Sequence, residues 1–437
     1  MAKTKGPSSS AIGRFVRLGG LAGRVGASVV GNQVLDLARS GPTRQIRQTE
    51  NMVRNAARIA ETLGELKGAA MKVGQMMSLH EGMLPPEVAD VLRSLQKEAP
   101  KVPAEVMEYE IRGSLENFDD LFESLDFEAF AAASIGQVHL GKLRDGRSVA
   151  VKIQYPLIEE IVKADLDNLK RVIQTVIRLV FEADVDAIWG EVRDRLLEEL
   201  DYTHEARNIR RMAELHADVP EIVIPRVVEE ASARNVLTME YVGGLSGEEA
   251  CAAEIDQELR NRWGRVLLEF SLRGLLEHRF LHADPNMANF AFLEDGRMVV
   301  YDFGCVKEVS PRMAAGYADL LVAVIHRQDA DIPEILKRIG VSTTDGEPMS
   351  RDLTDPYAEI FSPVARTDPP YTFGEDNMYH QLMEHGMDSW SKATNIQFPE
   401  DAIFVNRTLS GHYGNLSKLR ATGPWRELIL RYAQPQS

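Results

Sequence analysis

The hydrophobic pattern of the chain predicts strands in its middle and helices around them. Apolar side chains recur at steps of three and four residues, the period of one helix face, at Leu63, Leu66, Ala70, Val73 and Met77. Continuous apolar runs at Ser148–Ile153 and Met298–Tyr301 predict buried strands. Each run follows a segment typical of a hairpin turn, Asp145-Gly146 before the first and Glu294–Arg297 before the second. Helical spacing returns at Met313–His326.

Two acidic segments around the second hairpin have the spacing of a phosphoryl-transfer site. Asn289 lies five residues after Asp284, as in the H-R-D-x-x-x-x-N loop of kinases, and Asp302 opens a D-F-G eighteen residues after Asp284. Transfer of a phosphoryl group needs metal ions on its oxygens and an acceptor held in line. We therefore expect Asn289 and Asp302 to bind Mg²⁺ and Asp284 to orient or deprotonate the acceptor. His282 is expected to be structural.

The first strand run carries the lysine that such a site requires. Lys152 ends a V-A-V-K segment, and the lysine of the kinase V-A-I-K strand reaches the α and β phosphates of ATP. The alternative is an ordinary exposed strand lysine.

Alanines replace most glycines in the loop expected to cover the phosphates, residues 131–138. Glycine there lets backbone amides approach phosphates, and a Cβ closes part of that space. The loop should therefore hold nucleotide differently from a protein kinase. A helix start capped by Ser134 is the other interpretation of this segment.

Four motifs in this order resemble the UbiB family of atypical kinase-like proteins, also called aarF-domain-containing kinases, in its coenzyme Q biosynthesis branch. They are the alanine-rich loop ending in A-S-I-G-Q-V-H with V-A-V-K, the H-A-D-P segment, a K-x-G-Q at Lys72–Gln75, and an E-x-D at Glu199–Asp201. The resemblance covers about residues 50 to 430. It implies an α+β, bilobal protein-kinase-like fold, with an N-terminal helical extension over the active site and a mostly helical large lobe.

The resemblance also implies roles for residues outside the two hairpins. Lys72, Gly74 and Gln75 would form a lid that blocks protein substrates, with Glu199 and Asp201 close by. Without the resemblance, the Lys72 helix is a core-packing helix with a solvated lysine. Glu159 and Glu160 come too early in the chain to pair with Lys152. The resemblance assigns the partner of Lys152 to a later helix, which implies Glu205. A salt-bridged surface helix is the alternative for these acidic residues.

The expected ligands are ATP and Mg²⁺. The nucleotide-binding residues predicted along the chain are Ala131, Ala132, Ala133, Ser134, Gln137, Lys152, Met239, Glu240 and Val242.

Length and composition suggest two lobes with extensions in a chain of 437 residues. We expect a basic leader at 1–48, a helical K-x-G-Q extension at 49–110, a small lobe with a helical insertion at 111–240 and a large lobe at 241–437. A net charge of −16 disfavours nucleic-acid binding.

The leader differs in charge from the rest of the chain. It carries eight basic residues against Asp36, a net charge of +7, which leaves about −23 for the remainder. This favours either a peripheral helix on anionic lipid or a disordered basic segment. Two cysteines indicate a reducing compartment, and no stretch approaches the ~18 apolar residues that span a bilayer. We therefore expect a cytoplasmic protein, with peripheral contact at the inner face of the membrane.

The sequence argues against a general protein kinase, because no A-P-E motif follows Gly304. The expected function is a Mg²⁺-dependent ATPase that supports isoprenoid-quinone or lipid metabolism, with water or a small lipid or quinone precursor as acceptor. The alternatives are a small-molecule phosphotransferase of the aminoglycoside or choline-kinase type and a nucleotide-binding pseudokinase scaffold. The segment Asn286-Met287-Ala288 departs from the family pattern His-Pro-Gly and leaves the turnover rate open.

Overall fold

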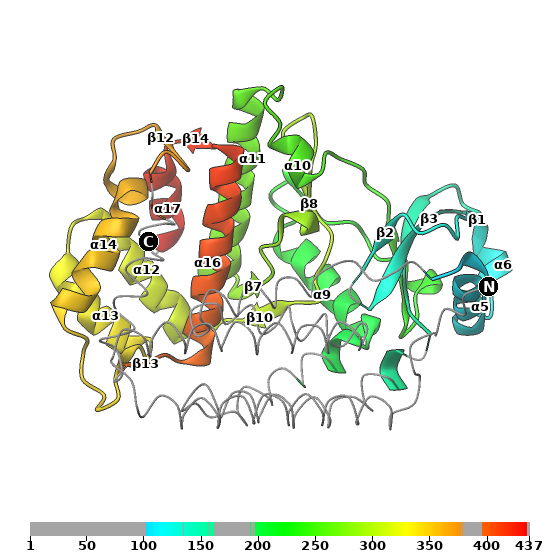
Figure 1. Cartoon of the computed structure of the whole chain (residues 1–437), viewed down its shortest axis with the longest axis horizontal. Coiled ribbons are helices and arrows are strands. Elements are labelled where there is room, and N and C mark those ends of the chain that lie inside the picture. Colours follow the sequence, from blue (N-terminus) through cyan, green and yellow to red (C-terminus); the bar gives the residue numbers. More distant parts are fainter. Residues whose placement is uncertain are drawn as a thin grey trace, which may run out of the picture. The chain divides into compact units, whose positions relative to one another are not determined.

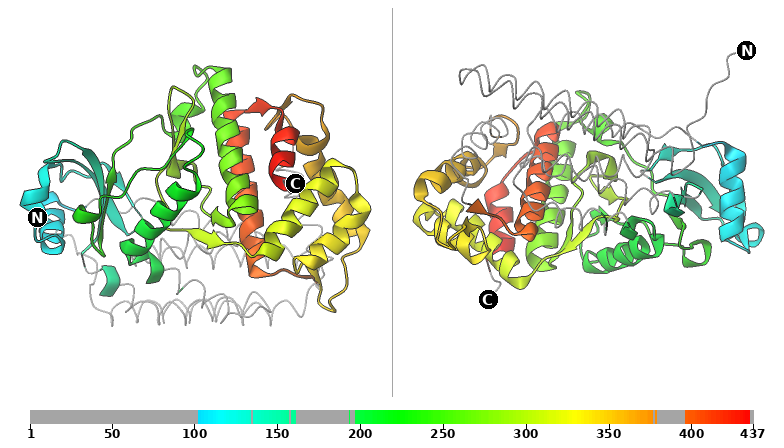
Figure 2. Two further views of the ribbon diagram at one scale, coloured as in Figure 1. Left: turned by 180° about the vertical axis from the view of Figure 1, so that it is seen from behind. Right: turned by 60° about the horizontal axis from the view of Figure 1, so that its bottom comes forward.

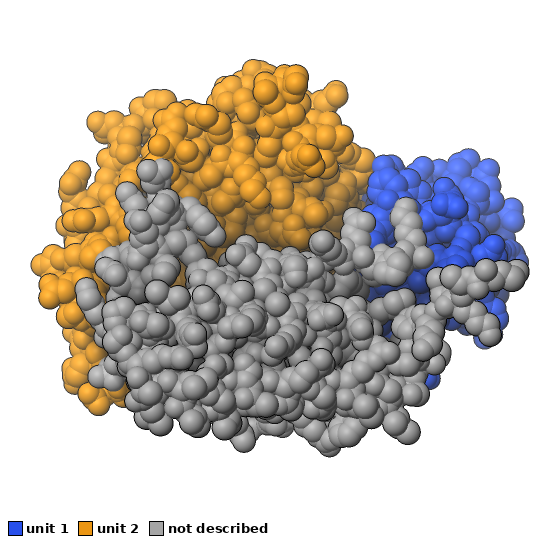
Figure 3. Space-filling view, viewed as in Figure 1, with its two compact units in different colours: residues 1–204, 227–241 blue, residues 205–226, 242–437 orange. Residues whose placement is uncertain are grey.

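The chain is described here by a computed structural model covering residues 102–133, 135–156, 158–160, 193, 197–376, 378 and 396–434 (Figure 1). It divides into two compact units, coloured in Figure 3. Unit 1 comprises Met1–His204 and Val227–Tyr241, and unit 2 comprises Glu205–Arg226 and Val242–Ser437.

Unit 1 is built on an antiparallel sheet in the order β1-β3-β4-β6, with β2 pairing β3. The strands are β1 (Phe122–Leu125), β2 (Ala131–Ala132), β3 (Gly136–Leu143), β4 (Ser148–Gln154) and β6 (Val236–Glu240). The predicted turn between β3 and β4 is confirmed, and Gly146 there has φ of +92°, a conformation that glycine adopts without strain. Strand alternation sends Val149, Val151 and Ile153 of β4 into the core.

Helix α5 (Ala104–Ser114) packs on the core face of this sheet. Met107 and Ile111 of α5 are fully buried and join the β4 residues in one hydrophobic cluster. The short helices α6 (Phe118–Leu121) and η1 (Glu229–Ala231) complete this layer. The expected boundary between residues 110 and 111 falls inside α5, because its apolar face is needed by the sheet.

Unit 2 is mostly helical, as predicted for the large lobe. Its helices are α9 (Tyr202–Leu215, beginning in unit 1), α10 (Gly247–Ala250), α11 (Gln257–Leu272), η2 (Arg273–Glu277), η3 (Met287–Asn289), α12 (Pro311–Ile325), η4 (Asp329–Asp331), α13 (Ile332–Arg338), α14 (Arg351–Arg366), α16 (Glu400–Leu419) and α17 (Trp425–Ala433). The long helices α11 and α16 pack side by side (Figures 1 and 2). They lie beside the short strands that carry the acidic motifs.

The strands of unit 2 form small sheets. They are β5 (Ile222–Val223), β7 (Phe280–His282), β8 (Phe290–Phe292), β9 (Met298–Val300), β10 (Val306–Glu308), β11 (Ser342–Thr343), β12 (Tyr371–Thr372), β13 (Ile396–Gln397) and β14 (Thr422–Gly423). The pairings are β5-β9-β8, β7-β10, β11-β13 and β12-β14. The predicted β8–β9 hairpin is confirmed, whereas β10, directly after the D-F-G, was not predicted.

Residues 205–226, expected in the small lobe, belong to unit 2. Two contacts explain this assignment: β5 pairs in parallel with β9, and the buried Arg273 guanidinium bonds both oxygens of Asp218 at 2.7 and 2.8 Å. A segment between two small-lobe strands thus contributes a strand and an ion pair to the other unit.

The α+β, bilobal kinase-like fold is confirmed by the antiparallel sheet of unit 1 and the helical unit 2. The predicted leader, the Lys72 helix and most of the helical insertion after residue 156 lie outside the described residues. Within the described part of the chain, no helix has both the length and the apolar character needed to cross a membrane.

Candidate active site

Lys152 lies on the face of the unit 1 sheet opposite the hydrophobic core cluster. Its neighbours in sequence, Val151 and Ile153, point into the core, and its cross-strand partner is Val138. The side chain is 9% exposed, and its Nζ lies 5.0 Å from the centre of the Tyr202 ring. A cation over an aromatic face is stabilised electrostatically. These contacts exclude the ordinary exposed strand lysine.

Strand register identifies the other side chains on the face of Lys152. Paired residues on neighbouring strands point to the same side, and the face alternates along each strand. Ala131 pairs with Val138, and Ala150 pairs with Met239, so all four share the face of Lys152. Val138 and Ala150 were not predicted from the sequence. Ala150 could have been, because it lies two residues before Lys152 and side chains two apart in a strand share a face.

The alanine-rich loop is a strand turning into β3. Ala131 and Ala132 form β2, and the amide of Ala133 donates to the carbonyl of Gly136 at 2.9 Å. The alternative of a helix start is therefore wrong for this segment, because its backbone groups pair with β3. Ser134 lies outside the described residues.

Gly136 and Gln137 follow this turn and contribute to strand packing. A Cβ on Gly136 would lie 2.2 Å from the carbonyl oxygen of Ile153, so only glycine fits between β3 and β4. Gln137 pairs with Ile153 and therefore points to the face opposite Lys152, where it is fully buried. Its expected contact with nucleotide remains a prediction.

Unit 2 carries the acidic residues. The amide of Tyr301 donates to the carbonyl of Asn289 at 2.9 Å, which continues the β8–β9 pairing by one step. Asp302 follows directly, so the hairpin brings both expected metal ligands to the same end. The Asn289 Nδ2 donates to the carbonyl of Asp284 at 3.3 Å, which leaves the carboxamide oxygen out of this bond. Geometry within unit 2 thus unites Asp284, Asn289 and Asp302.

His282 is structural, as expected. The ring is buried, and its Nε2 is 2.6 Å from the carbonyl oxygen of Asp302. The bond ties β7, which leads into the catalytic loop, to the backbone of the D-F-G.

The unusual segment Asn286-Met287-Ala288 is held by its own side chains. Asn286 Oδ1 accepts from the amide of Ala288 at 3.1 Å and caps η3, and Asp284 Oδ1 accepts from the amide of Asn286 at 3.2 Å. Met287 packs on α10, where a Cβ on Gly247 would lie 2.1 Å from its Cγ. The loop is therefore held by the Asn286 cap, at the position of the family histidine, and by the packed Met287, at the position of the family proline.

Helix α9 holds the D-F-G backbone at Phe303. The buried Glu205 carboxylate accepts from the Phe303 amide at 3.4 Å, and the buried Asn208 Nδ2 donates to the Phe303 carbonyl at 3.0 Å. Glu205 was expected only as the partner of Lys152, and that pairing stays a prediction. Asn208 was missed, although it lies one helical turn after Glu205.

The other predicted site residues lie near the ends of helices and strands or outside the described part of the chain. Asp201 Oδ1 accepts from the amide and hydroxyl of Thr203 at 2.9 and 2.6 Å, which begins helix α9. Glu199 is half-buried just before this helix, and Glu240 ends β6. The carbonyl of Val242 accepts from the Tyr301 hydroxyl at 2.6 Å. Lys72, Gly74 and Gln75 lie outside the described residues.

The Asn289–Asp302 pair fits Mg²⁺ by its chemistry. Mg²⁺ is commonly held by one or two protein oxygens, with the other positions taken by water and phosphate oxygens. One carboxylate and one carboxamide oxygen suit that pattern. Among the described residues, no group of three or more His, Cys, Asp or Glu side chains could hold a metal by itself.

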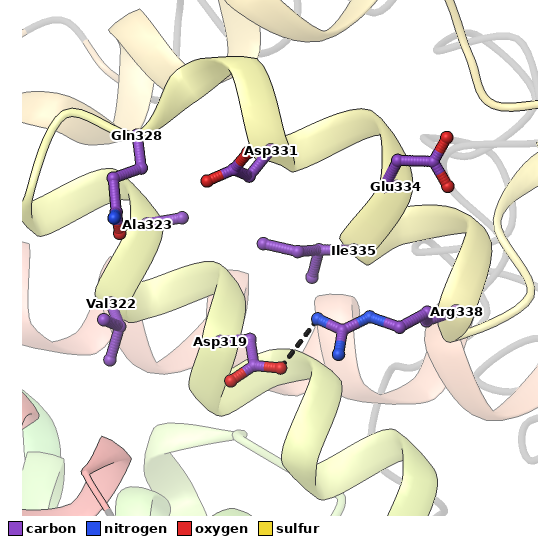
Figure 4. Close-up of a pocket in the computed structure, with 8 residues that line it drawn as sticks. All are labelled: Asp319, Val322, Ala323, Gln328, Asp331, Glu334, Ile335 and Arg338. Atoms are coloured by element: carbon purple, nitrogen blue, oxygen red, sulfur yellow. Dashed lines mark hydrogen bonds and ion pairs between the residues drawn. The ribbon is translucent and has the colours of Figure 1, made fainter.

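A separate surface pocket of about 320 Å³ lies between α12 and α13 (Figure 4). Asp319, Asp331, Glu334 and Arg338 stand around an apolar floor, and Arg338 pairs with Asp319 at 2.7 Å. None of the predicted site residues lines it.

The fold and these residues define a kinase-like protein. A family model described as the ABC1 atypical kinase-like domain matches residues 94–336, more than half of the chain. The chain belongs to this family.

The chain is also similar to proteins that are named as atypical kinases. The chain is 30% identical over 382 residues to the mitochondrial atypical kinase coq-8 of Caenorhabditis elegans, covering 84% of this chain and 49% of that protein. It is also 30% identical over 397 residues to the mitochondrial atypical kinase COQ8B of Danio rerio, covering 86% of this chain and 60% of that protein. The chain thus spans about half to three fifths of the length of these two relatives.

A solved structure is similar over most of the chain. It is the complex of Rv3197 with erythromycin from Mycobacterium tuberculosis, with a TM-score of 0.64 and 28% sequence identity. The similarity covers 90% of this chain and all of that chain.

Proposed function

We propose that this protein binds ATP with Mg²⁺ and hydrolyses it, or transfers its terminal phosphoryl group to a small lipid-like acceptor, in support of isoprenoid-quinone or lipid metabolism. The observation that carries the proposal is the β8–β9 hairpin, which brings Asn289 and Asp302 together beside Asp284. Membership of a family whose named relatives are atypical kinases supports the same class of chemistry.

Each side chain has a role in this proposal. Lys152 neutralises phosphate charge, and Asp284 orients the attacking hydroxyl or water and accepts its proton. Asn289 and Asp302 would hold Mg²⁺, which when bound neutralises charge on the phosphate oxygens. Glu205 and Asn208 fix the backbone beside Asp302, so the carboxylate is positioned before nucleotide arrives.

The proposed acceptor is not a protein hydroxyl. The missing A-P-E motif removes the peptide platform of protein kinases, and the Lys72 lid would occupy the space of a protein substrate. Peripheral contact of the basic leader with anionic lipid at the inner face of the membrane would bring a lipid acceptor within reach.

ATP hydrolysis by the purified full chain tests the proposal. Hydrolysis is measured with and without Mg²⁺, anionic liposomes and a phenolic prenyl-lipid mimic, for wild type, Asp302→Asn and Asp284→Asn. Asp295→Asn is the matched control, because Asp295 is an exposed aspartate in the turn of the same hairpin. We expect Mg²⁺-dependent turnover in wild type and the control, and background rates in the two site variants.

The other outcomes identify the alternatives. Unchanged hydrolysis in Asp302→Asn would overturn the assignment. Transfer of label from the γ-phosphate to a soluble alcohol would favour a small-molecule phosphotransferase, and nucleotide binding without hydrolysis under all conditions would favour a pseudokinase scaffold.

A further inference from the structure

Helix α16 presents a buried polar face within unit 2. Thr408, His412 and Asn415 follow one another at steps of four and three residues, so they share one side of the helix. All three are at least 96% buried, which is unusual for polar side chains. Thr408 bonds its own helix, through Oγ1 to the carbonyl of Phe404 at 2.9 Å. The other two, with Gly411, contact the segment that contains the catalytic loop.

Asn415 holds the backbone of the catalytic loop. Its Nδ2 donates to the carbonyl of Pro285 at 2.7 Å, and Pro285 directly follows Asp284. A buried amide that donates to a carbonyl holds that carbonyl in place, because breaking the bond leaves the buried amide without a partner. The orientation of the peptide after Asp284 is therefore set from a helix 130 residues further along the chain.

Gly411 allows the loop to approach the helix. A Cβ at this position would lie 2.2 Å from Cγ and 2.7 Å from Cβ of Pro285, well inside van der Waals contact. The proline ring therefore packs directly on the backbone of α16. Only glycine permits this approach without moving the loop.

His412 supports the other end of the loop. Its ring packs at 5.8 Å on Phe290, the first residue of β8, and Phe290 packs at 5.7 Å on His282. His282 in turn bonds the Asp302 carbonyl. The contacts run from α16 through two rings to the backbone of the D-F-G.

We propose that Gly411, His412 and Asn415 form a positioning surface, the α16 support, that sets the catalytic loop so that Asp284 faces the phosphoryl acceptor. This inference rests on the proposed function. The three residues touch neither nucleotide nor metal in it and act through Pro285 and Phe290.

A pair of glycines on the same helix gives the sharpest test. Gly411→Ala pushes a methyl group into Pro285, whereas Gly414→Ala places one where no atom lies within 4 Å. We expect kcat for ATP hydrolysis to fall about 10- to 100-fold in Gly411→Ala, because misplacement by about 1 Å has such effects. Nucleotide affinity should stay within about twofold, and Gly414→Ala should match wild type.

A second pair of variants tests the hydrogen bond. Asn415→Asp keeps the size but replaces the donor with a carboxylate that repels the Pro285 carbonyl. Asn406→Asp is its control on the same helix, because Asn406 uses its oxygen to accept from the Tyr317 hydroxyl at 2.8 Å and a carboxylate preserves that bond. Asn415→Asp should lower kcat as Gly411→Ala does, and Asn406→Asp should not.

Hydrogen exchange separates this inference from the proposed function. Amides of residues 281–290 should exchange about tenfold faster in Gly411→Ala and Asn415→Asp than in their controls, whether or not the protein hydrolyses ATP. If wild type does not hydrolyse ATP but the exchange difference is present, the proposed function is refuted and the α16 support still stands. Equal exchange in all four variants, or full turnover in Gly411→Ala and Asn415→Asp, would overturn the support.

Discussion

Replacement of Asn208 by alanine tests how far α9 controls the metal ligand. The substitution removes the buried 3.0 Å hydrogen bond to the carbonyl of Phe303, the residue that follows Asp302. Leaving a buried carbonyl without its donor costs about 1 to 3 kcal/mol. For a unit of this size, each kcal/mol lowers the unfolding midpoint by about 2 to 4 °C. We expect a midpoint about 2 to 12 °C lower.

The same substitution should weaken Mg²⁺-dependent nucleotide binding more than stability alone explains. Groups that orient a metal ligand without touching the metal typically contribute 10- to 100-fold to metal affinity. The assay is a titration of a fluorescent ATP analogue at increasing Mg²⁺, well below the unfolding midpoint. The Mg²⁺ concentration for half-maximal binding should rise about tenfold, while binding without Mg²⁺ should be unchanged.

Glu214→Ala is the control, because Glu214 is an exposed residue of the same helix. If Asn208→Ala has the unfolding midpoint and Mg²⁺ dependence of this control, the bond to Phe303 contributes nothing and the role of α9 is refuted.

Two further substitutions test the packing that surrounds the site. Gly136→Ala should separate β3 from β4, because its Cβ overlaps the Ile153 carbonyl, and should lower nucleotide binding and the unfolding midpoint; Gly113→Ala, with open space around it, is the control. Burial lowers the pKa of His412 from 6.5 to about 3, so the unfolded chain takes up a proton in this range that the folded chain refuses. Stability is therefore complete above pH 6.5 and should fall by about 2 kcal/mol by pH 5 through this group. Urea unfolding at both pH values should show a loss about 2 kcal/mol larger in wild type than in His412→Leu, because the buried His216, whose pKa is also lowered, contributes equally to both.

Local patterns explain which parts of the site could be predicted. Both hairpins, Lys152 and the Asp284–Asn289–Asp302 set follow from spacing and turn chemistry, because these contacts are between residues close in sequence. Asn208 could also have been predicted, since it shares a helix face with Glu205.

Contacts between distant segments could not be predicted. The bond from Asn415 to Pro285 joins residues 130 apart, and the pairing of β5 with β9 joins residues more than 70 apart. No local signal marks such partners, because a buried asparagine has the same local pattern as a solvated one. The alternative of a helix start at the alanine loop failed for a related reason: pairing with β3, and not helix propensity, decides the conformation of Ala131 and Ala132.

Binding of ATP measured by calorimetry, with and without Mg²⁺, is the most direct test of the central claim. If Asp302 holds Mg²⁺, the ion should strengthen ATP binding to wild type and to Asp295→Asn, and this strengthening should disappear in Asp302→Asn. Identical Mg²⁺ dependence in wild type and Asp302→Asn would contradict it.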